Sequence, residues 1–358
     1  MNWPYRGFRV ALVLYVIACL SSLACRSAAQ TIDMDGEYTV TTWEGPKGAS
    51  VGFGDGKIWL LKSNELISLG EDLKPLTPIP IEEIEIRSWT VGGGSIWILG
   101  KSKGFSGLHR IDSQTGKLTD TVSLQGEKYA AILYAYGSIW AAPAFVLAKG
   151  KPLLRIDPET KHVTEIGDDF KGQLVASDGK LWMLGVEDGK VRSLDPQSNK
   201  VIDDFSVGRE HDNGLIKNII KGPSKAGGYS FAISDGMLWV LDVKGLYGER
   251  HVLSGYELKT HERIAKLETD GALWGPVIWN GYVWLSTRGD PHSGHYISKI
   301  DPGLKHTVGR ILIPASPGGQ EANFLPPILA AEGDSLWALS GNWYSKKAPV
   351  IVRRFRAK

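Results

Sequence analysis

The chain has 358 residues, with 43 glycines, 13 tryptophans and a formal net charge of +2. This balance of charge argues against a nucleic-acid partner, which requires a concentrated basic surface. The two cysteines, Cys19 and Cys25, lie within the first 29 residues, so a chain cleaved after Ala29 would use neither disulfides nor thiol chemistry.

Residues 1–29 are expected to be a signal peptide. Arg6 and Arg9 precede an apolar stretch over residues 10–24, and the small residues 27–29 offer a cleavage site. An uncleaved membrane anchor is one alternative, although the stretch is shorter than the roughly 20 residues that span a bilayer. A lipid anchor on Cys19, after a lipoprotein-like box at residues 16–19, is another. The sequence therefore predicts a periplasmic or secreted protein that contacts membrane only through its leader or a lipid.

After this leader, one short pattern recurs seven times. Apolar residues and a tight turn are followed by Ile, Leu or Val, then Trp, and further apolar residues. The seven tryptophans are spaced 38 to 57 residues apart, with a mean of about 46. Such a period indicates small stacked units that cannot bury their apolar faces alone. The units fill residues 30–358, which are expected to form one domain, and the tryptophans are Trp59, Trp97, Trp140, Trp182, Trp239, Trp284 and Trp337.

The fourth unit is the clearest copy. Turn signals such as Asp178-Gly179 separate four short apolar segments, which is typical of a four-stranded antiparallel meander. Four-stranded sheets repeated around an axis are the blades of a β-propeller, so the sequence predicts an all-β, seven-bladed propeller. A β-sandwich or a β-helix fits the number and length of the units less well. The expected strands of this unit are 174–177, 180–184, 190–195 and 200–205.

The last unit lacks a fourth strand, because the chain ends soon after an expected third strand at 350–355. Residues 37–43 resemble a fourth strand, and we expect them to complete this blade and remove its free edge. The basic run Arg353, Arg354 and Arg356 is expected to be a solvated edge-strand face rather than an anion site. The repeated tryptophans are expected to pack between blades.

The units carry the phrases Asp-Gly-x-Leu-Trp, as at residues 178–182, and Arg-Ile-Asp-Pro, as at 155–158. In these phrases the chain resembles exported propellers of the YVTN/NHL group and, more distantly, the virginiamycin B lyase family. This resemblance implies a propeller, which can host binding proteins, lyases, hydrolases or oxidoreductases. The lyase family works with paired histidines, a glutamate and magnesium. That implies His251 with Glu249, and His295, although the family's Trp-Phe-Thr-Glu strand is absent here.

The order of strands in a blade predicts where a site would form. Connections between the second and third strands, and between blades, share one face, and there they are long in units five to seven. Arginines in these loops suit a carboxylate or phosphate, and a tryptophan offers a flat apolar wall. The alternative is that these are solvent loops with no shared pocket. The candidate ligand-binding residues are Arg209, His211, Glu249, His251, Arg288, Asp290, His292, His295 and Trp343.

No pattern typical of a catalytic or metal centre is present. The glycine-rich segments 52–56 and 92–94 precede expected strands rather than helices, so they offer no phosphate loop. No cofactor or metal is expected, and no catalytic residue can be named. We expect an exported, monomeric binding module for an unknown polar ligand, peptide or protein. The alternatives are a lyase or hydrolase acting on a small polar substrate through His251 and His295, and a structural role in the cell envelope.

Overall fold

The computed structural model covers the chain, and its description extends to sixteen segments. The predicted signal peptide, residues 1–29, lies outside them, as do most of the expected ligand loops. The described residues are 30–34, 37–47, 49–62, 64–70, 72–124, 129–143, 151–167, 172–185, 189–207, 229–242, 251–269, 271–289, 294–303, 306–315, 327–340 and 349–358.

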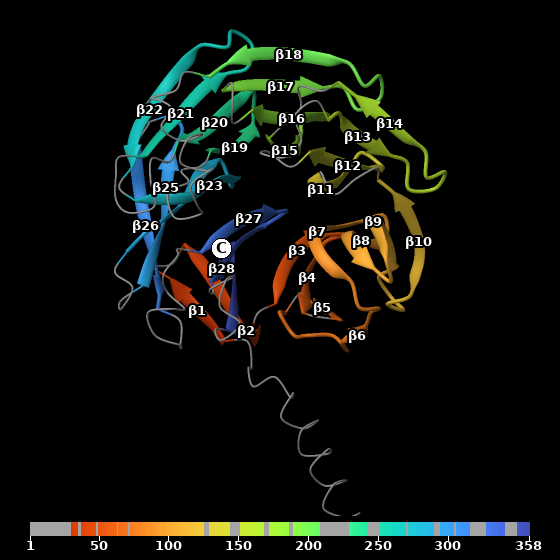
Figure 1. Ribbon diagram of the computed structural model, residues 1–358. Helices are drawn as coiled ribbons and strands as arrows, with labels where there is room; N and C mark the ends of the chain where they lie inside the picture. Colours follow the sequence, from red (N-terminus) through yellow and green to blue (C-terminus); the bar gives the residue numbers. More distant parts are fainter. Residues whose placement is uncertain are drawn as a thin grey trace, which may run out of the picture.

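Seven antiparallel sheets stand around a central axis, which confirms the seven-bladed β-propeller (Figure 1). Six sheets have four strands and one has five. The described segments contain strands and turns but no helix, and none of them provides a helix suited to crossing a membrane.

Blades 1 to 4 each use one continuous stretch of chain. Blade 1 consists of β3 (Ser50–Gly54), β4 (Lys57–Lys62), β5 (Glu65–Leu69) and β6 (Ile79–Pro80). Blade 2 consists of β7 (Glu85–Gly92), β8 (Ser95–Ser102), β9 (Phe105–Asp112) and β10 (Leu118–Ser123). Blade 3 consists of β11 (Tyr129–Ala135), β12 (Ser138–Pro143), β13 (Leu153–Ile156) and β14 (Val163–Ile166). Blade 4 consists of β15 (Gly172–Ser177), β16 (Lys180–Gly185), β17 (Lys190–Leu194) and β18 (Val201–Ser206).

The remaining blades complete the ring. Blade 5 consists of β19 (Tyr229–Ser234), β20 (Met237–Asp242), β21 (His251–Glu257) and β22 (Arg263–Thr269). Blade 6 consists of β23 (Ala272–Trp279), β24 (Tyr282–Thr287), β25 (Gly294–Asp301) and β26 (His306–Pro314). Blade 7 consists of β27 (Ile328–Glu332), β28 (Ser335–Ser340) and β29 (Pro349–Ala357), together with β2 (Tyr38–Lys47) and β1 (Gln30–Met34).

The predicted closure of blade 7 by the N-terminal strand is confirmed. β2 pairs antiparallel with β29, from Tyr38 opposite Ala357 to Lys47 opposite Pro349, and Figure 1 shows β1 and β2 in the same blade as β28. β1 adds a fifth strand outside β2, which the sequence pattern did not indicate.

The same arrangement overturns the expectation for the basic run in β29. Because β29 lies between β28 and β2, it is not an edge strand. Arg353 is only 7% exposed, and the Arg354 side chain is 11% exposed. The expected solvated face is therefore wrong for these two residues and holds only for Arg356, whose side chain is 41% exposed.

The repeated tryptophans pack as predicted. All seven are buried, and Trp97 shares a cluster with Ile132 and Ile139 of the next blade. The indole Nε1 of Trp140 donates to the carbonyl of Ala135, five residues earlier, at 3.0 Å. Equivalent bonds are made by Trp59, Trp97, Trp182 and Trp284. Each of these rings therefore fills a seam and also fixes the turn that begins its own strand.

We call the face formed by connections between first and second strands, and between third and fourth strands, the turn face. The opposite face, formed by the other connections, is the loop face. On the turn face, the first connection of every blade is a two-residue turn. Asp55 and Asp178, the leading residues of two such turns, have φ of +52°, a conformation that Asp tolerates better than most residues.

A second turn-face device explains the Arg-Ile-Asp-Pro phrase. The aspartate after the third strand accepts backbone N–H groups of the turn that follows, as Asp157 Oδ1 does from Thr160 at 2.7 Å. These backbone bonds to Thr160 and Glu159 hold the pKa of the Asp157 carboxyl below its usual value. Asp112 and Asp195 make equivalent bonds. The aspartate therefore fixes the turn into the fourth strand.

The basic residue of the same phrase ties neighbouring blades together. The Arg110 guanidinium lies 5.1 Å from the Trp97 ring centre and donates to the Pro158 carbonyl of blade 3 at 3.2 Å. Arg155 repeats this arrangement over Trp140 and reaches Asn199 of blade 4 at 3.1 Å. The contacts with the tryptophan rings are cation–π interactions within one blade, which contribute about 0.5–2 kcal/mol each, and the hydrogen bonds reach the next blade.

The seam between blades 6 and 7 uses a lysine in the same position. Lys299 lies over Trp284 and donates to the Glu37 carboxylate at 3.1 Å. Glu37 immediately precedes β2, so this contact also secures the closing strand. The turn face is thus bound from blade to blade around much of the ring.

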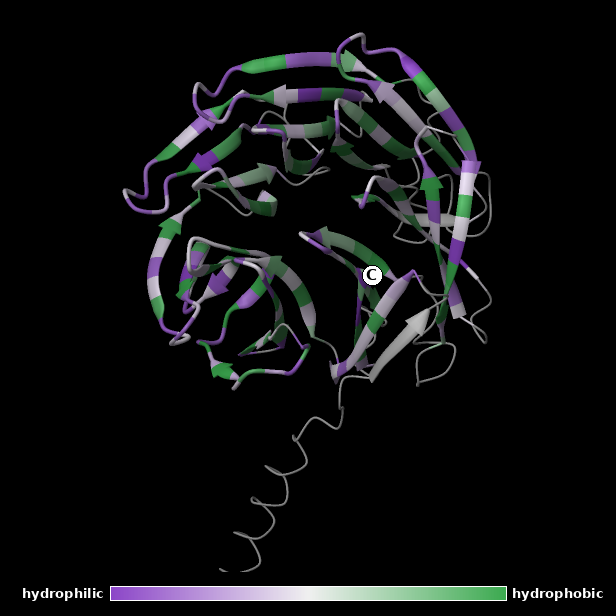
Figure 2. Cartoon of the chain, turned by 180° about the vertical axis from the view of Figure 1, so that it is seen from behind, coloured by the Kyte–Doolittle hydropathy of each residue, from purple (hydrophilic) through white to green (hydrophobic). Residues whose placement is uncertain are grey.

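The innermost strands approach one another closely, which accounts for the glycine-rich segments. A Cβ atom added at Gly52 would lie 2.6 Å from the Trp89 ring, and one at Gly92 would overlap Tyr134. These glycines therefore permit packing near the axis. Along the outer strands, hydrophobic and hydrophilic residues alternate, as expected for sheets with unlike faces (Figure 2).

Candidate functional site

The two faces differ in their connections. Every connection between first and second strands on the turn face is a two-residue turn. On the loop face, residues 207–228, 243–250, 315–327 and 341–348 separate consecutive strands of blades 4 to 7. Long connections on a rigid ring are the usual place for ligand binding.

Three of the nine predicted ligand-binding residues belong to the described segments, namely His251, Arg288 and His295. The other six fall outside the described residues, and they are Arg209, His211, Glu249, Asp290, His292 and Trp343.

Both described histidines lie in third strands rather than in loops. His251 begins β21 and is fully buried, and His295 is the second residue of β25 and is 4% exposed. The sequence analysis placed this pair in loops, whereas the structure places both residues in strands. His295 Nδ1 accepts the Gly289 N–H at 3.1 Å, so a neutral His295 carries its proton on Nε2.

Arg288 begins the connection that leads to the strand of His295. It directly follows β24, is partly buried, and its backbone N–H donates to the Gly271 carbonyl at 2.8 Å. Its neighbour Gly289 is the residue bonded to His295. The structure thus brings Arg288 and His295 to one end of blade 6, whereas His251 lies in blade 5.

A set of buried polar residues near the loop face was missed by the sequence analysis. The residue three positions after the repeated tryptophan is Asp242, Thr287 or Ser340 in blades 5, 6 and 7, and each is buried. In blades 1 to 4 the same position holds Lys62, Gly100, Pro143 and Gly185. Aligning the units on their tryptophans reveals this difference.

The third strands of the same blades add three further buried polar residues. We call the six residues together the polar rim. Thr287 and Ser298 are hydrogen-bonded at 3.0 Å, and Arg353 donates to Ser340 at 2.9 Å. In blade 3, the third-strand position is filled by the buried Leu154. The polar rim consists of Asp242, Ser254, Thr287, Ser298, Ser340 and Arg353.

Blade 2 has a neutral variant of this arrangement. His109 occupies the third-strand position, is 1% exposed, and its Nε2 lies 3.4 Å from the Gly100 carbonyl. Burial lowers the pKa of this imidazole, which favours its uncharged form. Blade 2 therefore places no buried charge at this position.

Arg353 is the charged member of the rim in blade 7. Its Nη1 donates to Ser340 Oγ, and its Nη2 donates to the Pro314 carbonyl of blade 6 at 3.4 Å. Burial lowers the pKa of Arg353 to about 10, so the guanidinium stays charged at neutral pH. Among the described residues, no carboxylate forms an ion pair with it.

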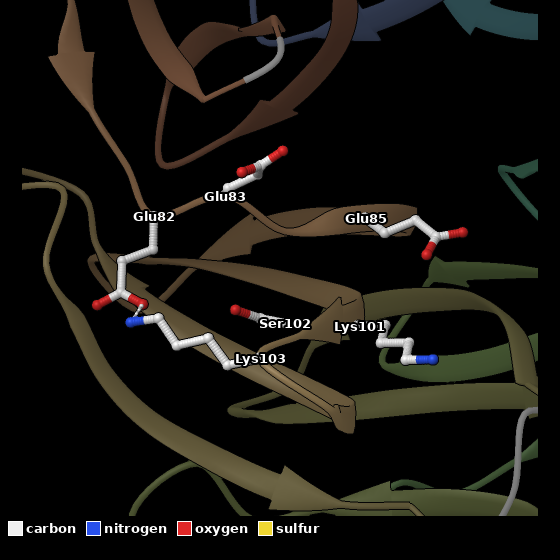
Figure 3. Close-up of a pocket in the computed structure, with 6 residues that line it drawn as sticks. All are labelled: Glu82, Glu83, Glu85, Lys101, Ser102 and Lys103. Carbon is white, nitrogen blue, oxygen red and sulfur yellow. Dashed lines mark hydrogen bonds and ion pairs between the residues drawn. The ribbon is translucent and has the colours of Figure 1, made fainter.

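A cavity of about 410 Å³ lies on the loop face of blades 1 and 2 (Figure 3). Lys103 and Glu82 form an ion pair of 2.9 Å on one side of it, and Glu85 and Lys101 lie on the other. Its charges are mixed, and the paired side chains are largely exposed. The described segments contain no group of three His, Cys, Asp or Glu residues arranged to hold a metal.

No protein-family model matches this chain, and no match to its sequence was found among curated proteins. Solved structures of similar shape include virginiamycin B lyase from Staphylococcus aureus, with 15% identity, a TM-score of 0.53, and coverage of 88% of this chain and 99% of that one. BamB from Moraxella catarrhalis has 12% identity, a TM-score of 0.51, and coverage of 92% and 94%. The Pan2 WD40 domain from Neurospora crassa has 12% identity, a TM-score of 0.57, and coverage of 91% and 97%.

These likenesses extend over nearly the whole chain. At such low identity they show that the fold is a propeller of the kind expected from the tryptophan repeat, and they do not carry an activity from any of these proteins to this one.

Proposed function

We propose that this protein is an exported, monomeric binding module that takes a polar ligand, peptide or protein on its loop face over blades 5 to 7. The observation that carries the proposal is the second-strand part of the polar rim, Asp242, Thr287 and Ser340, where blades 1 to 4 have Lys62, Gly100, Pro143 and Gly185. Export is proposed from the leader-like residues 1–29.

The energetics favour a functional reading of the rim. A buried polar group that loses its hydrogen-bond partners costs about 1–3 kcal/mol, so a scaffold gains nothing from collecting such groups. Blade 3 shows that the fold accepts the apolar Leu154 instead. At the position three residues after the repeated tryptophan, buried polar side chains occur in blades 5 to 7 alone, which supports a ligand that approaches the loop face there.

A ligand screen tests this proposal. Thermal-shift measurements of the mature protein with panels of short peptides and small organic acids would identify a ligand. The affinity of the Thr287→Ala and Arg288→Ala variants for that ligand would then be compared with the affinity of the parent protein. We expect affinity to fall at least about tenfold in these variants. Lys161→Ala, in a turn-face connection with a side chain that is 48% exposed, is the matched control and should bind as the parent does. Equal weakening by Lys161→Ala would place the ligand elsewhere.

The alternative is a lyase or hydrolase acting on a small polar substrate. It is favoured by the matching burial of His251 and His295 in adjacent blades, and by the Gly289 N–H that orients the His295 ring through Nδ1. Magnesium or calcium should then raise the melting temperature, and His251→Ala and His295→Ala should abolish that rise. An absent metal response, with both variants behaving as the parent, removes the enzyme hypothesis.

A further inference from the structure

Two arginines occupy the same repeat position in different blades. Arg192 pairs with Met183 in blade 4, and Arg353 pairs with Ala338 in blade 7. Met183 and Ala338 are each the residue that follows the repeated tryptophan. Both arginines are 7% exposed. The two side chains therefore share burial and register, and any difference between them comes from their surroundings.

The fourth strand supplies that difference. Asp204 pairs with Arg192 across β17 and β18, and its carboxylate lies 3.7 Å from the Arg192 Nε. Thr42 holds the matching position opposite Arg353 in β2. Blade 7 thus keeps the buried cation but has no carboxylate in the place where blade 4 provides one.

The donors around Arg353 converge. A guanidinium has five N–H donors, and the Arg353 contacts to Ser340 and Pro314 use two of them. Ser340 accepts through its oxygen, so its own hydroxyl hydrogen is left for another acceptor. Both Ser340 and Pro314 end their strands at the loop face, which locates these donors at the blade 6 and blade 7 sector of that face.

A buried charge is stable only when it is paired and hydrogen-bonded, and arginine suits planar oxyanions in particular. We propose that Arg353 and Ser340 form an oxyanion-binding subsite, which takes a carboxylate or phosphate group of the ligand where Asp204 stands in blade 4. This inference deepens the proposed function, because it assigns the chemical group that the loop face binds.

The test uses simple anions and an internal competitor. The melting temperature of the mature protein would be measured in sodium acetate and in sodium phosphate at about 100 mM, against sodium chloride at equal ionic strength. For an anion that binds at ~10 mM, we expect a rise of about 2–4 °C. Thr42→Asp introduces a carboxylate at the position matching Asp204, so its melting temperature should not respond to either anion. Arg353→Met should not respond either, and Arg192→Met, the matched control in blade 4, should respond as the parent does.

The separate acetate and phosphate measurements also distinguish a carboxylate ligand from a phosphorylated one. A response to acetate alone supports a ligand with a carboxylate, and a response to phosphate alone supports a phosphorylated ligand. No response to either, or an undiminished response in Thr42→Asp, overturns the subsite. That failure is distinct from failure of the proposed function, which depends on whether Thr287 and Arg288 affect ligand affinity.

Discussion

Blade 4 is built from one stretch of chain, residues 172–206, whereas blade 7 joins three late strands to β2 from the other end. In blade 4 the fourth strand supplies Asp203 and Asp204. In blade 7 the residues at those positions are Thr41 and Thr42, which face Arg354 and Arg353. The two sheets share strand order and register but differ in how their charges are balanced.

The difference separates what the fold requires from what it leaves open. Arg354 has a carboxylate partner on the turn face, Asp334 at 3.3 Å, as Arg110 has Glu159 and Lys299 has Glu37. Arg353, one residue earlier and directed to the opposite side of its sheet, has no carboxylate partner among the described residues. On the turn face, the contact of a third-strand cation recurs at several seams between blades. On the loop face, the residue at the Arg353 position differs from blade to blade. Scaffold and site are thus divided between alternate residues of a single strand.

The largest expected effect concerns the closure that makes blade 7 different. Deleting residues 30–47 removes Tyr38, Val40 and Trp43, which are all buried. At about 2 kcal/mol for each side chain, the free energy of unfolding should fall by about 6 kcal/mol, with a steep loss in melting temperature.

Deleting only residues 30–34 is the control. That change removes β1 and leaves the pairing of β2 with β29 intact, so it should cost far less. Similar melting temperatures for the two deletions would mean that β2 does not hold the ring closed.

The second prediction compares the repeated tryptophans of these blades by urea unfolding. Trp182→Ala and Trp337→Ala should each cost about 3–5 kcal/mol, because each leaves a large cavity. The cost should be greater for Trp182, whose indole donates to Ser177, since that carbonyl loses its partner. Trp337 Nε1 has no hydrogen-bond partner within the described residues. A greater loss for Trp337 would contradict this account.

The third prediction concerns the acid that blade 7 lacks. Asp204→Asn should lower the free energy of unfolding by about 1 kcal/mol, because the buried Arg192 loses its carboxylate partner. The loss stays small because the Asp204 side chain is partly exposed, and water weakens the ion pair. Thr42→Asn, the matching change in blade 7, should be close to neutral in the same urea titration. Equal effects would show that the two arginines have equivalent surroundings.

The smallest effect is the pH dependence of stability that Asp203 of blade 4 contributes. Burial alone would raise the pKa of Asp203, but hydrogen bonds from Ser193 and Lys180 outweigh it and hold the value below normal. A depressed folded pKa stabilises the protein above the unfolded value of about 3.9, and this stability is lost as pH falls through the folded pKa.

Asp203→Asn should therefore lose less stability than the parent between about pH 5 and pH 2.5, as measured by urea unfolding at each pH. Thr41, the matching residue of blade 7, does not titrate, so Thr41→Ala should keep the parental slope. An unchanged slope in Asp203→Asn would rule out this contribution.

Much of the fold could be predicted from sequence because its signals are local and repeated. Two-residue turns such as Asp178-Gly179 and the tryptophan that follows them mark each blade, and the missing fourth strand of the last unit pointed to residues 37–43. β1 escaped notice because nothing in residues 30–34 repeats the blade pattern.

The site was predicted less well because burial depends on distant strands. A run such as Arg353-Arg354 has the composition of an exposed edge, and only the cover supplied by β2 buries it. His251 and His295 were assigned to loops, since their strands begin without an apolar alternation that would mark the boundary. The polar rim was within reach, because Asp242, Thr287 and Ser340 share one position in the repeat.

The pairing of Tyr38 with Ala357 also has a consequence for biosynthesis. A ribosome adding 5–20 residues per second would release β2 roughly 15 to 60 seconds before its partner β29. Throughout that interval a ten-residue strand with three Thr, one Val and one Trp has an unpaired edge. During that interval β2 of the nascent chain can pair with a wrong strand. The yield of folded protein in a cell should therefore depend on how well β2 is protected from such pairing until β29 is made.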